Sequence, residues 1–316
     1  MANEKSGKRK TRIACFKQGG AVFYAFMLLL PVTQFLIFYI GVNFNNILLA
    51  FKSYDRVSGA SAFVGWDNFI HIFDVYEAQP ILRDSIINSC KYFALNLFLI
   101  VPLTLLFAYY IFKKFRYSGF FKVMLFFPSI ISAMVLTVFY KSWADLAAPE
   151  LLEKLFNITD IPEGLLANST TNEATVMVFN VLLGFSSMIL VYLNAMSQVP
   201  EACVEASKID GAGEFRIFFR IVIPSIWPTL VSFILIALAG FATNQANLYS
   251  LYGDGAWTNH LSTLGYYLFE LVNSGVYGGT GMYPYAAALG VFLTLIIAPI
   301  TLVIRWLLNK FGPSEN

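Results

Sequence analysis

The chain has 316 residues, of which 58% are hydrophobic and 13% are charged, and its formal net charge is +2. Soluble domains carry about 25% charged residues, so this composition excludes a typical soluble globular protein. Six intervals contain no charged residue, and each is near or above the ~18–20 residues of a membrane-spanning helix. These intervals are residues 18–51, 92–112, 123–140, 174–200, 221–253 and 271–304. They are too long and too uniformly apolar for the strands of a membrane barrel, so we predict an all-α membrane protein with six transmembrane helices.

The predicted elements begin with a basic tail at residues 1–18, followed by one transmembrane domain over residues 19–316. The first helix, at 20–45, has an apolar stretch far longer than the ~7–15 residues of a secretory signal, and we predict that it stays as an anchor. The later helices are expected at 85–112, 121–143, 173–196, 225–249 and 284–308. Outer segments are expected at 46–83, 144–172 and 250–282.

Lysine and arginine are distributed unevenly among the connections. The two terminal segments, the second–third connection and the fourth–fifth connection together hold 15 of the 21. Because basic residues gather on the cytoplasmic side, both termini are predicted to lie in the cytoplasm. A nucleic-acid partner is the alternative interpretation of the basic tail; we favour the topology signal and expect no nucleic acid.

A short polar segment, residues 197–224, separates the fourth and fifth helices. Pro200 suits the start of a helix, and the carboxylates of Glu201 and Glu205 are favoured near a helix N-terminus. The run Asp210-Gly211-Ala212-Gly213 ends that helix, and a second short helix follows. Four apolar residues are expected on one stripe of this second helix: Phe215, Phe218, Phe219 and Val222. The segment is therefore predicted to form two short helices at an angle.

Two functions suit this segment. Its first helix can seat in a groove on a soluble partner, because Ala202, Ala206 and Gly211 are small and Glu205 can pair with a basic residue. The alternative is an ordinary interfacial helix that lies on membrane lipid.

The spacing within this segment carries a resemblance. Glu205-Ala206-Ser207 is followed after three residues by Gly211, and after nine more by Ile221 and then Ile223-Pro224. This pattern resembles the cytoplasmic loop of permease subunits of binding-protein-dependent ABC importers, with Ser207 and Ile223 in place of the usual alanine and leucine. The run from Glu205 to Ala212 is similar to the carbohydrate branch of that family, typified by maltose and glycerol-phosphate uptake systems.

Other segments resemble landmarks of the same family. They are Val64–Phe69 after the first helix, Asn88 at the second, Phe126-Phe127-Pro128 in the third and Tyr285–Ala288 in the last. One segment departs, because Tyr252–Ala256 stands where the family usually carries Thr-x-Gly-Gly-Pro. The branch, and with it the substrate, stays open at this point.

The resemblance implies the type I ABC importer permease fold and a multi-pass protein of the bacterial plasma (inner) membrane. It also implies four kinds of partner besides lipid: a second homologous permease, two cytoplasmic ATPases that bind ATP and magnesium, an extracytoplasmic solute-binding protein, and a sugar substrate. This chain has no phosphate-binding loop, and no cofactor, metal or catalytic residue of its own is expected. The residues expected to contact an ATPase are Glu201, Ala202, Glu205, Ala206, Ser207, Asp210, Gly211 and Ala212.

Uncharged polar residues collect in the predicted fifth helix. Since sugars are bound by hydrogen bonds and aromatic faces, we predict a sugar path lined by Asn244, Gln245, Asn247 and Tyr249. The alternative is that these residues hold helices together, as Asn and Gln commonly do in membranes. Two other function classes are an ion-coupled secondary carrier, which is expected to bury charges in mid-membrane, and a membrane scaffold that moves no solute.

Overall fold

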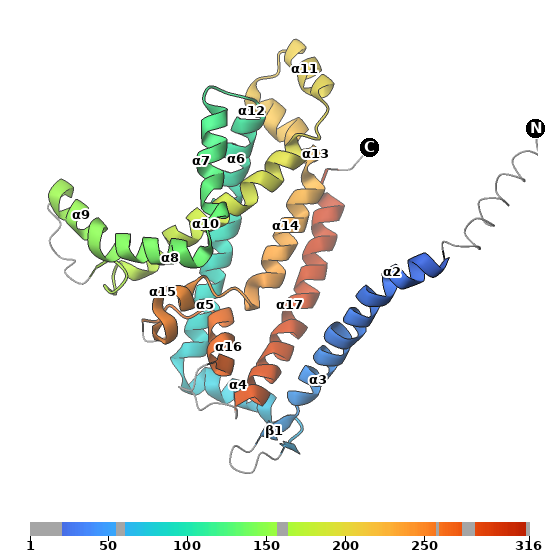
Figure 1. Ribbon diagram of the computed structural model, residues 1–316, viewed down its shortest axis with the longest axis vertical. Coiled ribbons are helices and arrows are strands. Elements are labelled where there is room, and N and C mark those ends of the chain that lie inside the picture. The colour runs from blue at the N-terminus through green and yellow to red at the C-terminus, as the bar shows by residue number, and fades with distance from the viewer. Residues whose placement is uncertain (1–20, 55–60, 157–163, 257–258, 274–281, 314–316) are drawn as a thin grey trace, which may run out of the picture.

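The computed structural model describes residues 21–54, 61–156, 164–256, 259–273 and 282–313. The predicted basic tail, residues 1–18, lies outside them. The described part of the chain is a bundle of long helices with a two-stranded hairpin at one end and two short helices protruding at the other (Figure 1). We call these the hairpin end and the loop end.

Within the described residues, four helices are long and apolar enough to cross a membrane. Two of them are α10 (Asn172–Met196) and α17 (Tyr283–Phe311). The other two contain a π-helical turn: α2 (Ala21–Gln34), η2 (Phe35–Gly41) and α3 (Val42–Leu49) form one, and α5 (Pro80–Leu95), η3 (Asn96–Ile100) and α6 (Val101–Phe112) form the other. Pro102 has no N–H to bond to the carbonyl of Phe98, which favours the wider turn at η3.

Two further spans are bent. α7 (Ser118–Ile130) is followed at 100° by α8 (Ala133–Ser142), η4 (Trp143–Ala147) and α9 (Ala148–Phe156). α12 (Glu214–Ile217), η5 (Phe218–Val222) and α13 (Ile223–Ser225) are followed at 70° by α14 (Trp227–Ala239) and η6 (Gly240–Ala242). The predicted number of six spans is obtained when each bent pair is counted as one.

The third span differs from the predicted single helix over 121–143. The chain is extended at Ile131 and Ser132, and α8 leaves in a new direction. Pro128 removes one hydrogen bond from the end of α7, which weakens the helix just before the break. Beyond the break, the hydroxyl of Tyr140 donates to the carbonyl of Thr175 at 2.6 Å. This contact holds α8 across the start of α10.

The fifth span is shorter than the predicted 225–249, because its last helical turn ends at Ala242. Residues Thr243–Asn247 form an irregular segment, followed by α15 (Leu248–Tyr252) and η7 (Gly253–Gly255). Ala246 and Asn247 have φ values of +49° and +56°, which no continuous α-helix contains. The polar residues predicted within a helix therefore lie mainly in an unwound segment.

The predicted outer segments contain short elements of their own. β1 (Lys52–Tyr54) and β2 (Ser61–Phe63) pair antiparallel with Lys52 opposite Phe63, and α4 (Asp67–Ala78) follows them. α16 (Leu264–Asn273) lies inside the predicted loop 250–282 and is largely buried. The prediction missed α16 because it used only the length of charge-free runs, which does not detect a ten-residue helix.

Buried side chains form the core at both ends of the bundle. At the loop end, α6 and α10 pack on α12 and η5, with Tyr192, Met196 and Ile217 fully buried. At the hairpin end, α4, α16 and α17 pack together around Leu264 and Leu289.

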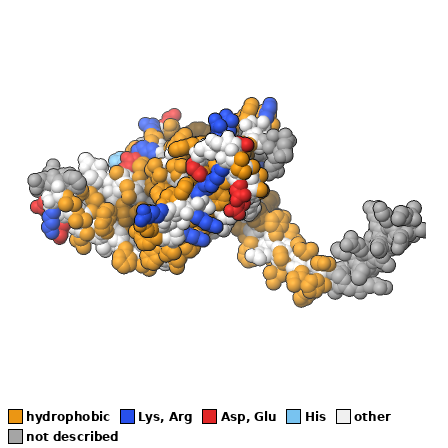
Figure 2. All heavy atoms as spheres, turned by 90° about the horizontal axis from the view of Figure 1, so that it is seen from above, with side chains coloured by type: hydrophobic (Ala, Val, Ile, Leu, Met, Phe, Trp, Pro, Cys, Tyr) orange, Lys and Arg blue, Asp and Glu red, His pale blue; other side chains and the backbone are white. Residues whose placement is uncertain are grey.

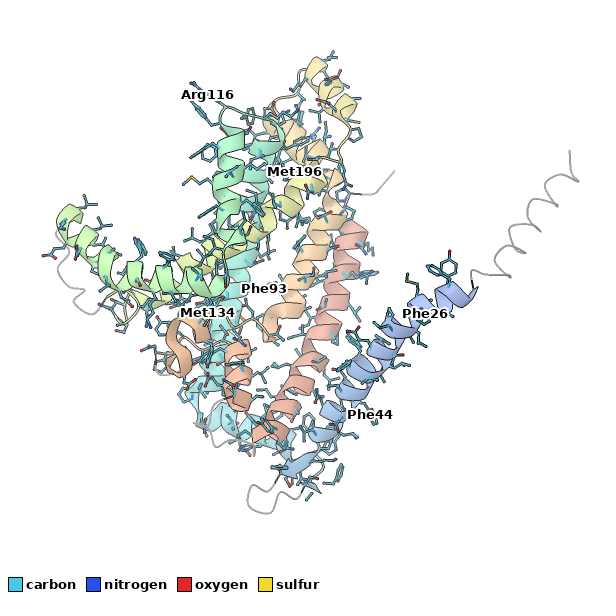
Figure 3. All side chains as sticks on the ribbon, in the orientation of Figure 1. Phe26, Phe44, Phe93, Arg116, Met134 and Met196 are labelled. Atoms are coloured by element: carbon cyan, nitrogen blue, oxygen red, sulfur yellow. The ribbon has the colours of Figure 1, made fainter. Side chains whose placement is uncertain are left out.

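The first helix is an exception to this packing. α3 packs against α17, whereas α2 diverges from the bundle (Figure 1). Phe26 and Phe44 lie on this helix in Figure 3, and they are 78% and 63% exposed. No residue of its apolar stretch is buried, so lipid or another protein must cover it.

Candidate functional site

The first candidate site is the protruding loop at the loop end. α11 (Glu201–Ile209) begins directly after Pro200 and carries Glu201 in its first turn. Gly211 follows its end with a φ of +77°, a conformation that favours glycine because other residues are strained there. The N–H of Ala212 donates to the carbonyl of Ser207 at 2.9 Å and closes the helix end. The loop thus consists of two short helical segments, as predicted: α11, and the segment Glu214–Ser225, which begins with α12 and leads into the fifth span.

The loop exposes most of the residues predicted to contact an ATPase. Six of the eight are exposed: Glu201, Ala202, Glu205, Ala206, Asp210 and Gly211. Ser207 and Ala212 are half-buried, and the Ser207 hydroxyl donates to the carbonyl of Val204 at 2.8 Å. Ile209 was not among the predicted residues, yet its side chain is 87% exposed. The loop therefore offers small, acidic and apolar side chains to a partner.

The buried side of the loop anchors it to the bundle. Val204, Ile217, Phe218 and Val222 are buried against α6 and α10. The expected apolar stripe is correct for Phe218 and Val222, whereas Phe215 and Phe219 are 79% and 61% exposed. The π-helical turn of η5, two residues before Pro224, changes the spacing that the prediction assumed. Viewed from above the loop end, Figure 2 shows basic and acidic side chains gathered there among hydrophobic ones.

Glu214, the first residue of α12, joins the loop to the end of α6. Its Oε2 lies 3.0 Å from Lys113 Nζ and accepts a hydrogen bond from the Tyr109 hydroxyl at 2.5 Å. The side chain of Lys113 is only 6% exposed, whereas that of Glu214 is 43% exposed. Burial alone would raise the pKa of the Glu214 carboxyl, but the hydrogen bond from Tyr109 and the positive charges of Lys113 and Lys208 hold this pKa below its usual value.

The second candidate site is a cavity of about 490 Å³ inside the bundle. The second to fifth spans line it, and the side chains of the described residues that line it are all uncharged. The polar ones are Tyr92, Asn96, Ser129, Asn180, Ser187, Asn244 and Asn247. A neighbouring cavity of about 270 Å³ shares Tyr92, Asn96 and Asn244. Asn96 lies halfway along the helix Pro80–Phe112, which places the cavity near the middle of the membrane-spanning region.

The unwound segment Thr243–Asn247 forms one wall of this cavity. The side-chain amide of Asn180 donates to the carbonyl of Ala246 at 2.9 Å, and that of Asn247 donates to Asn180 Oδ1 at 3.2 Å. The hydroxyl of Thr263 donates to the carbonyl of Asn244 at 2.8 Å. Irregular backbone at membrane depth occurs only where protein buries it or where it lines a cavity, and both conditions hold here.

The four residues of the predicted sugar path separate into two groups. Asn244 and Asn247 line the cavity. Gln245 and Tyr249 are not among the described residues that line it, and the ring of Tyr249 instead lies 4.8 Å from that of Phe269. Sequence reasoning missed Tyr92, Asn96 and Ser129. An asparagine in the middle of a charge-free run was the signal that could have revealed Asn96.

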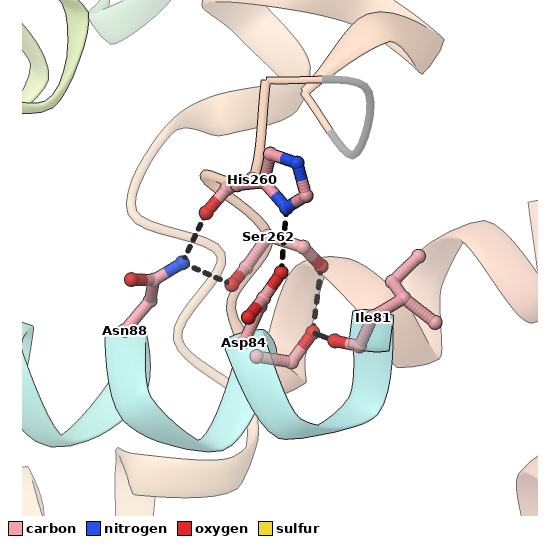
Figure 4. A network of polar contacts seen from close by, with 6 residues as sticks. Ile81, Asp84, Asn88, His260 and Ser262 are labelled. Atoms are coloured by element: carbon pink, nitrogen blue, oxygen red, sulfur yellow. Dashed lines mark hydrogen bonds and ion pairs between the residues drawn. The ribbon is translucent and has the colours of Figure 1, made fainter. Parts of the chain in front are cut away.

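At the hairpin end, polar residues of α5 fix the loop that precedes α16 (Figure 4). Asn88 donates to the carbonyls of His260 at 2.7 Å and Ser262 at 3.0 Å. Ser85 Oγ lies 2.9 Å from Ser262 Oγ, and Asp84 Oδ2 lies 2.7 Å from His260 Nδ1. These bonds hold the loop that leads into α16 in a defined position. Thr263, the last residue of that loop, in turn bonds to Asn244 in the cavity wall, so the wall is positioned as well.

Comparison with known proteins identifies the family. The model of the family described as "Binding-protein-dependent transport system inner membrane component" matches residues 99–314, which include the loop and most of the cavity. The chain belongs to this family. The protein is therefore a multi-pass permease component of the inner membrane, as the sequence predicts.

Two relatives and one solved structure show how far the likeness extends. The permease is 26% identical over 286 residues to the arabinooligosaccharides transport system permease protein AraP of Bacillus subtilis, covering 89% of this chain and 86% of the relative. It is 23% identical over 255 residues to the maltose/maltodextrin transport system permease protein MalF of Klebsiella aerogenes, covering 78% of this chain and 49% of that relative, so the match spans about half the length of MalF.

The solved structure confirms the predicted ABC importer fold. It is a chain in the crystal structure of a bacterial alginate ABC transporter in complex with an alginate pentasaccharide-bound periplasmic protein. The TM-score is 0.72 at 20% sequence identity, and the likeness covers 93% of the permease and 96% of that chain.

Proposed function

We propose that this permease is one of two homologous membrane subunits of an ATP-driven sugar importer. Two cytoplasmic ATPase subunits, which bind ATP and magnesium, drive the importer by docking on the exposed loop. An extracytoplasmic solute-binding protein delivers the sugar, and the polar cavity passes it across the membrane. The observation that carries the proposal is that α11 and the turn after it expose six of the eight residues predicted to contact an ATPase, while Val204 anchors the other side of α11. A short helix held in this way is suited to a groove on a partner.

The cavity favours an uncharged sugar. Its volume of about 490 Å³ falls within the ~300–1,000 Å³ typical of small-molecule sites. The amides of Asn96, Asn244 and Asn247 can bond to sugar hydroxyls, whereas both amide hydrogens of Asn180 are donated to the carbonyls of Val176 and Ala246. Among the described lining residues there is no charged side chain to balance a carboxylate. The names of AraP and MalF, which refer to arabinooligosaccharides and maltodextrin, support a neutral oligosaccharide.

The first experiment tests the ATPase partner. The permease, with a purification tag, is extracted from its membrane in mild detergent, and co-purified proteins are identified by mass spectrometry. We expect an ATPase and a second permease. Gly211→Pro should release the ATPase, because proline cannot adopt the φ of +77°.

Gly213→Ala is the matched control for this experiment. Gly213 has a φ of −70°, and a Cβ added there meets nothing within 4 Å. This variant should keep the ATPase. Equal recovery of the ATPase with both variants would contradict the docking role of the α11 end.

The second experiment tests the substrate. The assembled importer and its binding protein are reconstituted in liposomes, and ATP-dependent uptake is measured for labelled arabino- and malto-oligosaccharides and for an acidic alginate oligosaccharide. We expect uptake of a neutral sugar and none of the acidic one. Uptake of the alginate oligosaccharide alone would refute the argument from the uncharged cavity.

A further inference from the structure

Besides its apolar packing and its continuation into α14, the loop at the loop end has two connections to the bundle that bear on movement. The first connection is covalent, because α11 follows α10 directly after Pro200. The second is the contact of Glu214 with Lys113 and Tyr109, which joins residues far apart in the sequence. Glu214 comes directly after the break at residues 210–213, so this polar contact ties the start of α12 to the end of α6, beside the apolar packing of Ile217 and Phe218 on α6 and α10.

The burial of Lys113 makes this contact specific. A lysine side chain that is only 6% exposed needs an acidic partner, since an unpaired buried charge is strongly disfavoured. Glu214 supplies that partner, and Tyr109 fills a second acceptor site on the same carboxylate oxygen. The Tyr109 hydroxyl also lies 3.3 Å from the Glu214 carbonyl, so the backbone at the start of α12 is held as well as its side chain.

The helix that carries Lys113 leads directly to the cavity. Lys113 follows α6, which continues through η3 into α5 as one span, Pro80–Phe112. Tyr92, Asn96 and Ile100 of this span line the cavity. A movement of α12 that pulls on Lys113 is therefore applied to the helix that forms a cavity wall. The π-helical turn at η3 lies between the two points, where such a movement can change the geometry of the lining residues.

We propose that Lys113, Glu214 and Tyr109 are positioning residues that transmit movement of the ATPase-docked loop to the cavity. This proposal rests on the proposed function and adds a specific route to it. The α10 connection holds the loop in place, whereas the Lys113–Glu214 pair carries its rotation to the second span. If the pair is lost, the ATPase stays bound, but nucleotide binding to it no longer changes the accessibility of the cavity.

The test measures the cavity directly and needs no knowledge of the sugar. Ser187 lines the cavity and is exposed, so Ser187→Cys supplies a labelling site after Cys15, Cys90 and Cys203 are replaced by serine. The reconstituted complex is labelled with a small charged thiol reagent, with and without ATP and vanadate. We expect nucleotide to change the labelling rate, because it changes which side of the cavity is open.

Four variants are then compared in this background. Lys113→Met and Glu214→Gln should each remove at least about nine-tenths of the nucleotide response while the ATPase still co-purifies. The double variant Lys113→Glu/Glu214→Lys should restore the response, because it rebuilds the ion pair with reversed polarity. Lys114→Met is the control, since Lys114 is the neighbouring lysine and its residue is exposed. It should respond like the parent.

Each outcome decides the proposal. A normal response in both single variants would overturn it, and so would a lost response that the double variant fails to restore. Loss of the ATPase in a single variant would also overturn it, because the pair would then be needed for docking and not for transmitting movement after docking. If the parent complex contains no ATPase, the proposed function itself fails, and that failure is visible before any variant is tested.

Discussion

Gly265, the second residue of α16, is the point at which the smallest change should have the largest effect on the cavity. A Cβ built on Gly265 would lie 2.5 Å from the carbonyl carbon of Thr243 and 2.6 Å from that of Asn244. Both neighbours are backbone atoms of the unwound segment, so neither can rotate away. Gly265→Ala must therefore separate α16 from the cavity wall.

The size of the change follows from these distances. Ordinary contact begins near 3.4 Å, so the two segments must separate by about 0.9 Å. Overpacking of this kind costs ~1–3 kcal/mol. The hydroxyl of Thr263 now donates to the carbonyl of Asn244 at 2.8 Å. If this distance grows by about 0.9 Å, it exceeds hydrogen-bonding range and the bond is lost. We expect a lower melting temperature, by at least about 2 °C, and a clear loss of sugar uptake.

The assay is a thermal-stability measurement on purified protein by gel filtration, followed by uptake in liposomes. Gly290→Ala in α17 is the control, because a Cβ there meets nothing within 4 Å. Alanine in a helix interior is favoured over glycine by ~0.5–1 kcal/mol, so this variant should be neutral or slightly more stable. Gly265→Ala with the stability and uptake of the parent would refute the reasoning.

Three further predictions concern the cavity and the loop. Gly184→Leu should reduce uptake of longer oligosaccharides before shorter ones, because a side chain there meets Ile100 at the cavity wall; an unchanged size profile would contradict this. Asn180→Leu should lower uptake and thermal stability, since an unpaired buried carbonyl at Ala246 costs ~1–3 kcal/mol; a variant as stable as the parent would contradict the role of this bond. The lowered pKa of Glu214 means that its stabilising contact is fully present above the unfolded-state pKa and is lost as pH falls through the lower folded-state pKa. Thermal stability measured in acidic buffers should therefore fall more steeply for the parent than for Glu214→Gln, and parallel curves would contradict the assignment.

Charge-free length predicts the long helices because lipid leaves few alternatives to a helix. The fourth helix, predicted at 173–196, is observed at Asn172–Met196. The exposed residues of the loop also follow from sequence, since its motif places Glu205 and Gly211 on a helix and at its end.

The remaining features depend on contacts between residues far apart in the sequence. The bend of the third span is held by Tyr140 against Thr175, and the end of the fifth is held by Asn180 and Thr263. The pairing of Lys113 with Glu214 is of the same kind. Hydropathy and local spacing contain no information about such partners. The predicted ends of the third and fifth helices, which lie near the cavity, were therefore the least accurate.

The first helix has a consequence for the membrane in which the permease works. Its apolar stretch, Phe23–Leu49, has 27 residues and is about 40 Å long, whereas the hydrocarbon core is ~30 Å thick. Such a mismatch is relieved by tilting or kinking of the helix or by local thickening of the bilayer. Because no residue of the stretch is buried, bilayer thickness is expected to influence the angle together with the packing of α3 against α17. A thicker bilayer should bring this helix more upright, and a thinner one should splay it further from α17.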